Sequence, residues 1–407
     1  MGVLMARSEL KPAGRFNGTE VKSAYEIGPV LIVSPWYRPN IGGIVEVADD
    51  LFSLLMSAGV EAHLLIIDHE TSREVKPDLK NKNLWWAYVL PYVFDRVSVK
   101  TIIGFAIKGP VYLWRLGRFV RKQRFRSVIL VYPTGNVWPF LFLQYILRFR
   151  LIVSLHGSDI RPYDNFGIFH RWLLRKLLRA ASVITVCADY LVEQASRLAP
   201  SQAAIIKCIP NCVDVKEFYP RPSTYTRACQ SPTFVHVSNF ATLKRVEDII
   251  EAFALFRAQQ ESRLIMVGDG IECERARKLA KGLHLDNCVV FAGVQNDIRS
   301  VLWESDVFVM ASDLESCPIA LLEAMACGLP FISTPKGLAS TLPFGEYGIL
   351  VANRSPKELA DAMFILGQDK EECARKGQRA RLWIEAHASQ SHYLKSHLEV
   401  LSYPIFA

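Results

Sequence analysis

The sequence predicts an α/β protein built from two doubly wound, parallel-sheet domains that face each other across a cleft. Short apolar, β-branched runs alternate with helical patterns almost throughout the chain, which is typical of parallel sheets covered by helices. This series restarts near Pro232, after the Pro-rich and polar segment 219–232. A length of 407 residues also favours two domains over a single hydrophobic core.

The domain boundaries follow from the same patterns. We expect a flexible tail over 1–28, a first domain over 29–210, a second domain over 211–385 and a C-terminal helix over 386–407 that packs back on the first domain. In the first domain the apolar runs predict strands at 30–34, 62–67, 127–132, 151–157 and 182–187, with helices at 45–58, 110–122, 169–180 and 189–198. In the second domain they predict strands at 233–238, 263–268, 288–293, 306–312 and 330–334, with helices at 246–259, 272–282, 297–305 and 319–327. Sheets of this kind bind ligands outside the carboxyl ends of their strands, so the residues directly after the strands are the functional candidates.

Composition excludes several classes of protein. Half of the residues are hydrophobic and 22% are charged, which is ordinary for a globular chain. No apolar run reaches the roughly 18 residues that span a bilayer, and the first 28 residues lack the apolar core of a signal peptide. The nine cysteines form no C-x-x-C pair, which argues against a disulfide scaffold or a zinc site and favours a reducing compartment.

The net charge of +8 is concentrated in the first half of the chain. Residues 1–210 hold 27 Lys and Arg against 16 Asp and Glu. The densest segments, 115–126 and 170–181, interleave cations with large apolar residues. Such segments suit an anionic membrane surface, and they are equally typical of solvated helix faces. No recognised nucleic-acid motif is present, so we expect no nucleic-acid partner.

Two strand ends stand out in the first domain. Gly42 and Gly43 follow the first strand and begin a helix, where backbone N–H groups could approach an anion, although a plain loop explains them equally well. No G-x-G-x-x-G is present, which disfavours a dinucleotide redox site. His156 and Asp159, in "HGSD" after the fourth strand, are expected to project into the cleft. Alternatively, His156 is a buried core residue and Asp159 is a helix N-cap.

In the second domain, Lys244 and Arg245 are expected at the N-terminus of a helix. Cations there oppose the helix dipole, and a bound diphosphate would resolve the conflict, although Glu247 and Asp248 offset part of it. "VGDG", with Gly268, provides a second glycine-bearing turn from strand to helix.

The segment "SDLESCPIALLEAMACGLP" places one carboxylate, Glu323, within an apolar helix. Ser316 is a plausible helix cap, and Pro318 suits the first turn. An unpaired carboxylate in apolar surroundings is costly, so Glu323 needs hydrogen-bond donors. A neighbouring Arg or backbone N–H would satisfy it, and so would the adjacent hydroxyls of a ribose. Glu315, in the loop before the helix, is expected to face the cleft.

Taken together, these motifs resemble the family 4 (group 1) retaining glycosyltransferases. The resemblance rests on the pair Glu315 and Glu323 followed by "AMACGLP", and on "HGSD", "IPNCVD", "VSNF", "KR" and "VGDG", and it spans about 29–370. It implies the GT-B fold, in which two Rossmann-like domains face each other across a cleft.

The resemblance also implies roles at the matching positions. Lys244, Glu315 and His156 would be catalytic: Lys244 would neutralise the leaving diphosphate, Glu315 would contact the donor sugar, and His156 would lie over that sugar. Glu323 would hold the ribose hydroxyls of the nucleotide. The other expected donor-binding residues are Gly42, Gly43, Arg245, Asp159, Asn239, Gly268, Ser316 and Ile319.

The chain departs from the family pattern near Lys244. Asn239 stands where the family usually has an Arg five residues before the Lys, and whether Arg245 replaces that Arg is open. Cys212 stands in "IPNCVD" where a Gly is common.

The resemblance therefore implies a hexosyl- or N-acetylhexosaminyl-type glycosyltransferase that uses a nucleotide-diphosphate sugar, and we expect neither a cofactor nor a metal. Positive side chains and helix N-termini can stabilise the leaving diphosphate, and no D-x-D motif stands out. The basic first domain favours a lipid-linked glycan acceptor in cell-surface polysaccharide or lipopolysaccharide synthesis, with the protein in the cytoplasm and peripheral on the inner face of the membrane. A soluble acceptor, or a non-catalytic protein that binds nucleotide sugars, are the alternatives.

Overall fold

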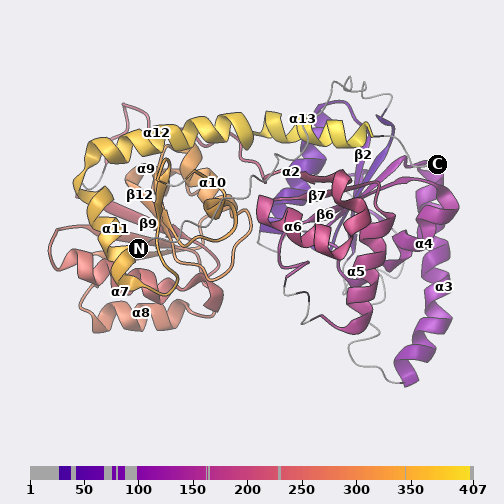
Figure 1. Cartoon of the computed structure of the whole chain (residues 1–407), viewed down its shortest axis with the longest axis horizontal. Helices are drawn as coiled ribbons and strands as arrows, with labels where there is room; N and C mark the ends of the chain where they lie inside the picture. Colours follow the sequence, from indigo (N-terminus) through magenta and orange to yellow (C-terminus); the bar gives the residue numbers. More distant parts are fainter. Residues whose placement is uncertain are drawn as a thin grey trace, which may run out of the picture.

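The computed structural model describes residues 27–37, 43–67, 76–78, 81–87, 99–161, 163, 166–227, 231–343 and 345–403. Two lobes, each with its own parallel sheet, lie side by side (Figure 1). The predicted architecture is thereby confirmed. The expected tail, 1–28, lies almost wholly outside the described residues.

The sheet of the N-terminal lobe has the strand order β3-β4-β2-β1-β5-β6-β7-β8. All neighbours are parallel except the short pair β3 and β4. Its strands are β1 (Val30–Ser34), β2 (Ala62–Ile67), β3 (Lys76–Pro77), β4 (Leu84–Ala87), β5 (Ser127–Val131), β6 (Arg150–Leu155), β7 (Val183–Val186) and β8 (Ile206–Cys208). β1, β2, β5 and β6 are fully buried, as their mostly apolar runs predict for strands covered on both faces.

Helices cover both faces of this sheet. One face packs against α2 (Gly43–Ser57) and α13 (Gln390–Leu401). Tyr393, Val400 and Leu401 of α13 belong to the same buried cluster as Leu51 of α2. The other face packs against α3 (Val99–Lys122), α4 (Trp138–Leu147), α5 (Ile168–Ala180) and α6 (Asp189–Leu198).

Helix α3 begins earlier than the sequence predicts. Pro110 is typical of a first helical turn, and we expected the helix to start there, but the helix begins at Val99 and contains Pro110 in its interior. Helix α4 was not predicted, because its apolar run lacks the periodicity of an amphipathic helix.

The sheet of the C-terminal lobe is entirely parallel, in the order β11-β10-β9-β12-β13-β14. Its strands are β9 (Thr233–Val237), β10 (Arg263–Val267), β11 (Val289–Gly293), β12 (Val307–Met310), β13 (Phe331–Ser333) and β14 (Gly348–Leu350). The helices are α7 (Val246–Arg257), α8 (Cys273–Gly282), α9 (Arg299–Glu304), α10 (Ile319–Ala326) and α11 (Pro356–Gln368).

The end of the described chain connects the lobes. Helix α12 (Lys370–His387) lies along the C-terminal lobe, and α13 continues onto the N-terminal lobe, as the yellow ribbons of Figure 1 show. Arg150 of β6 donates a hydrogen bond to the carbonyl of Leu401, and Ser389 forms a β-bridge with Val213 of the connecting segment 209–232.

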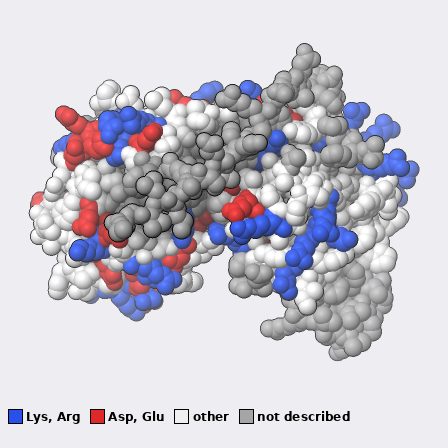
Figure 2. All heavy atoms as spheres, in the orientation of Figure 1, with Lys and Arg blue, Asp and Glu red and all other residues white. Residues whose placement is uncertain are grey.

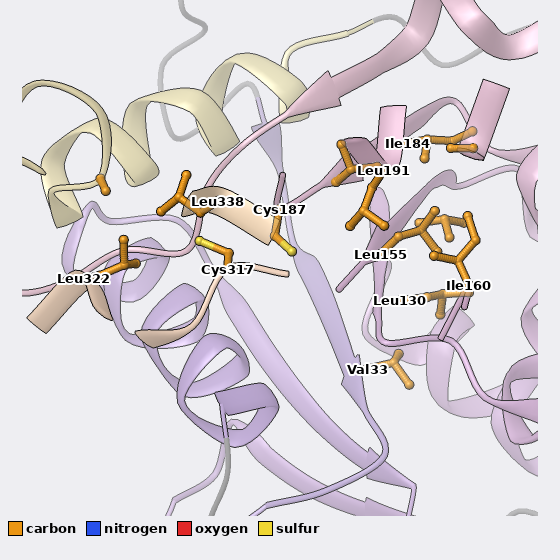
Figure 3. Close-up of a cluster of buried hydrophobic side chains, with 14 of the residues drawn as sticks. Val33, Leu130, Leu155, Ile160, Ile184, Cys187, Leu191, Cys317, Leu322 and Leu338 are labelled. Atoms are coloured by element: carbon orange, nitrogen blue, oxygen red, sulfur yellow. The ribbon is translucent and has the colours of Figure 1, made fainter. Parts of the chain in front are cut away.

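Buried apolar side chains also join the two lobes. One continuous cluster contains Cys187 and Leu155 of the N-terminal lobe together with Cys317, Leu322 and Leu338 of the C-terminal lobe. Figure 3 shows Cys187 beside Cys317 and Leu338. The carboxyl ends of the two sheets are therefore held close to each other.

Candidate active site

The loop after β6 brings His156 to the edge of the N-terminal lobe that faces the other lobe. Its Nε2 lies 3.0 Å from the Ser154 hydroxyl, and its buried Nδ1 has no hydrogen-bond partner. Burial lowers the pKa of His156 to about 4, so the imidazole is neutral at physiological pH.

Asp159 does not project into the cleft as the sequence suggested. Its carboxylate accepts hydrogen bonds from the backbone N–H groups of His156 (3.0 Å) and Gly157 (2.8 Å), and the residue is buried. Burial raises the pKa of Asp159 to about 7, and the backbone donors oppose that rise. Asp159 therefore shapes the loop that carries His156.

In the C-terminal lobe, Lys244 and Glu315 form an ion pair between two strand-end loops. The Lys244 ammonium lies 2.5 Å from Glu315 Oε1, which also accepts a 2.8 Å hydrogen bond from the Ser312 hydroxyl. Lys244 ends a 3-10 turn after β9, directly before α7, and Glu315 follows β12. The two side chains are mostly buried.

Arg245 is directed elsewhere. It lies at the N-cap of α7 with φ of 53°, and its guanidinium binds the Asp248 carboxylate through Nε at 3.0 Å and Nη2 at 2.6 Å. In this arrangement Arg245 does not contact Glu315. Asn239, the position where an Arg would be usual, is exposed.

Gly268 lets two strand-end turns approach closely. It has φ of 122°, and an added Cβ would lie 1.7 Å from the carbonyl oxygen of Ser238. The turns after β9 and β10 therefore pack together in a way that only glycine permits.

The loop before α10 is held from the N-terminal side of the cleft. The Tyr190 hydroxyl, on α6, lies 2.8 Å from the Ser316 hydroxyl and donates to the Glu315 carbonyl at 3.1 Å. Asn211 Nδ2 donates to the carbonyl of Cys317 at 2.7 Å. Tyr190 was not predicted from the sequence, because its partners are more than 120 residues away along the chain; Asn211 lies in "IPNCVD", where that motif could have pointed to it.

The same loop touches the His156 loop. Gly157 has φ of 115°, and a Cβ there would lie 1.8 Å from the Ser316 hydroxyl oxygen. The two loops that carry His156 and Glu315 are therefore in contact across the cleft.

The N-termini of α2 and α10 also meet there. A Cβ on Gly43 would lie 3.7 Å from the Ile319 side chain, which begins α10. Gly42 lies outside the described residues.

Glu323 is the one acidic residue of α10. No hydrogen bond or ion pair is formed by its carboxylate within the described structure, and most of the side chain is shielded from solvent. Burial raises the pKa of Glu323 to about 7, and the nearby Glu46, Glu217 and Asp50 raise it further. Glu46 and Asp50 lie on α2, so α2 and α10 bring like charges together.

This arrangement offers an oriented cation, an unpaired carboxylate and two helix N-termini at one cleft. Lys244 and the free N–H groups of a helix N-terminus suit phosphate oxygens, and the Glu323 carboxylate suits hydroxyl groups. In the described ranges, no group of three or more His, Cys, Asp and Glu side chains is placed to hold a metal ion.

Comparison with known proteins matches both lobes to family models. The model described as "Glycosyl transferase 4-like domain" matches residues 42–212, and the one described as "Glycosyl transferases group 1" matches residues 231–369. The chain belongs to the group 1 glycosyltransferases. This glycosyltransferase therefore carries both halves of the family's architecture.

Among curated relatives, the glycosyltransferase is 30% identical over 240 residues to the N-acetyl-alpha-D-glucosaminyl L-malate synthase of Bacillus anthracis. That match covers 58% of this chain and 62% of the relative. This chain is also 28% identical over 290 residues to a GDP-mannose-dependent alpha-(1-6)-phosphatidylinositol monomannoside mannosyltransferase of Mycobacterium tuberculosis. That second match covers 65% of this chain and 74% of the relative.

A solved structure shares the fold. The crystal structure of Anabaena HepE in complex with UDP superposes with a TM-score of 0.76 at 17% identity, covering 92% of this chain and 99% of HepE. The GT-B fold predicted from the sequence is thereby confirmed, and the two family models confirm the group 1 glycosyltransferase family.

Proposed function

We propose that this glycosyltransferase moves a hexosyl or N-acetylhexosaminyl group from a nucleotide-diphosphate sugar to a lipid-linked glycan, in the assembly of cell-surface polysaccharide or lipopolysaccharide. The observation that carries the donor assignment is the unpaired, largely shielded carboxylate of Glu323, in the middle of α10 and on the same lobe as Lys244. A ribose would supply the missing donors, and Lys244 would lie toward the diphosphate.

The chemistry follows from the bonds that change. The bond between the anomeric carbon and the phosphate oxygen breaks, a bond from that carbon to an acceptor oxygen forms, and the acceptor proton passes to the leaving phosphate. Negative charge grows on the diphosphate, so fixed positive groups lower the barrier. Lys244 and helix N–H groups would supply that charge without a metal. Glu315 would keep Lys244 oriented and contact the sugar, over which the neutral His156 would lie.

We further propose retention of anomeric configuration, by attack on the face from which the phosphate departs. No side chain in the described part of the site is assigned as a nucleophile. The remaining donor contacts are proposed for Gly42, Gly43, Asn239, Ser316 and Ile319, through backbone and loop atoms, and Gly268 would shape its turn. The local role of Arg245 would be to fix the start of α7 through Asp248.

The acceptor assignment has two candidates. The name of the mycobacterial relative specifies a phosphatidylinositol mannoside, which supports a lipid acceptor. The name of the Bacillus relative specifies malate, which supports a small soluble acceptor. The basic N-terminal lobe favours the lipid.

A donor panel tests this function. The purified protein is incubated with UDP- and GDP-sugars and with either lipid-linked glycans or small hydroxy acids, and release of the nucleoside diphosphate is measured with and without EDTA. We expect release only with a lipid-linked acceptor, unchanged by EDTA, and an α-configured product from an α-configured donor. Release that requires a divalent metal would contradict the metal-free proposal. Nucleotide binding without turnover on any acceptor would instead identify a non-catalytic protein.

A further inference from the structure

Large apolar side chains are exposed on three neighbouring helices of the N-terminal lobe. Helix α3 exposes Trp114 (63%), α4 exposes Tyr145 (74%) and Ile146 (70%), and α5 exposes Ile168 (80%) and Trp172 (43%). Val111 and Phe142 extend the same set. We call the outer faces of α3, α4 and α5 the three-helix face.

The three helices form one continuous layer. Gly117 of α3 lies against Leu143 of α4, where a Cβ would come within 2.9 Å of the leucine side chain. Gln144 of α4 donates to the carbonyl of Ala180 at the end of α5. The exposed aromatic and aliphatic groups therefore share one side of the lobe, on the face of the sheet away from α2 and α13.

The charge of this layer has a single sign. Between residues 99 and 181 the sequence has 15 Lys and Arg and only two Asp, with no Glu. Asp159 is buried and binds backbone N–H groups. Exposed cations, among them Arg118, Lys176 and Arg179, flank α4, which has no charged residue. In Figure 2 the blue atoms on this lobe, on the right, have little red among them, whereas the other lobe mixes both colours.

We propose that the three-helix face docks on an anionic membrane surface. Aromatic side chains favour the boundary between headgroups and acyl chains, and nearby cations are attracted to anionic headgroups. A second copy of this chain fits poorly, because two faces of the same positive sign repel each other.

The position of the face relative to the candidate site favours this partner. Ile168 and Trp172 lie at the start of α5, directly after the loop that begins with His156. A membrane against α5 would bring lipid headgroups to the edge of the cleft. This inference rests on the proposed function and adds a docking surface to it. Membrane binding is measured without donor or acceptor, so that the docking surface and the transfer activity can be refuted separately.

The test measures co-sedimentation with vesicles of phosphatidylcholine alone and with phosphatidylglycerol added, at low and high salt. We expect binding only to the anionic vesicles, weakened by salt. Tyr145→Ser with Ile146→Ser should lower the affinity at least tenfold. Lys176→Gln with Arg179→Gln should lower it about 25-fold at low salt, since each cation near an anionic surface contributes roughly a fivefold factor.

Matched controls come from the C-terminal lobe. Ile365→Ser with Leu382→Ser removes exposed apolar groups there, and Arg275→Gln with Lys278→Gln removes two exposed cations; both pairs should leave binding unchanged. Equal binding to neutral vesicles, control pairs that weaken binding as much as the three-helix variants, or stronger binding to single-stranded RNA than to vesicles would overturn the proposal. Nucleoside diphosphate release from a detergent-solubilised acceptor should persist in the three-helix variants.

Discussion

Glu323→Gln should make the ligand-free protein more stable. Burial raises the pKa of Glu323 from 4.5 to about 7, so the folded protein keeps a proton that the unfolded chain releases between those pH values. Stability therefore falls as pH rises from 4.5 to 7, and the penalty is complete above pH 7. The difference between a pKa of 4.5 and one of about 7 corresponds to a penalty of roughly 3 kcal/mol, which Gln would remove at pH 8 and not at pH 4.

The same substitution should weaken nucleotide binding. A hydrogen bond to a charged group contributes about 1.5–3 kcal/mol, which corresponds to roughly a 10- to 100-fold change in affinity. Calorimetric titration with UDP and GDP measures this change. The 2′-deoxy analogue of whichever nucleotide binds should bind the wild type more weakly, and the variant should no longer distinguish the two forms.

Urea unfolding at pH 4 and pH 8 measures the free energy of unfolding of the wild type and of Glu323→Gln. Glu251→Gln is the control, because Glu251 is exposed on α7. That control should change neither stability nor binding. A Glu323→Gln variant that is less stable at pH 8 would show that the carboxylate has a structural partner. Unchanged nucleotide affinity would remove the ribose assignment.

Three further substitutions test the cleft. Lys244→Gln should lower kcat roughly 100- to 1,000-fold, because stabilisation of the leaving group is lost. Arg245→Gln should lower kcat less than tenfold in the same assay. Similar losses of kcat in both variants would refute the different roles proposed for Lys244 and Arg245. Tyr190→Phe removes a hydroxyl that joins the lobes, so the contact between the lobes should weaken by about 1 kcal/mol. Small-angle scattering should then show a more open ligand-free protein. An unchanged scattering profile would count against the contact. Gly157→Ala introduces a Cβ at a φ of 115° against the facing loop and should abolish transfer, whereas Gly59→Ala, at a φ of 77° in open space, should cost only about 1 kcal/mol in thermal unfolding with transfer intact.

Much of the fold could be predicted from local patterns. The buried strands β1, β2, β5 and β6 are mostly apolar runs, and their composition and length identify them without any tertiary information. The three-residue strands β8 and β14 show no such run, whereas the equally short β13 lies within the predicted segment 330–334. Pro110 was misleading because α3 begins eleven residues earlier, at Val99, and holds the proline in its interior.

The site could be predicted in its residues but not in its contacts. Strand ends and the isolated charge within α10 identify His156, Lys244 and Glu323 as candidates. The direction of a short side chain depends on the loop conformation, which is why Asp159 binds its own backbone rather than facing the cleft. The contact of Tyr190 with Ser316 depends on how two lobes meet, which no local pattern encodes.

The ion pair of Lys244 and Glu315 explains how an ammonium group can remain mostly buried in the cleft before the donor binds. An unpaired, mostly buried ammonium would be costly, and Glu315 offsets that cost while it fixes the position of the charge. The loop that carries Glu315 is itself held by Tyr190 from the opposite lobe. Because the cation depends on Glu315, and the Glu315 loop depends on lobe contact, opening of the cleft would loosen the charge that we propose to meet the diphosphate. The diphosphate would then meet an ordered cation only in the closed protein, which couples closure of the lobes to the chemistry.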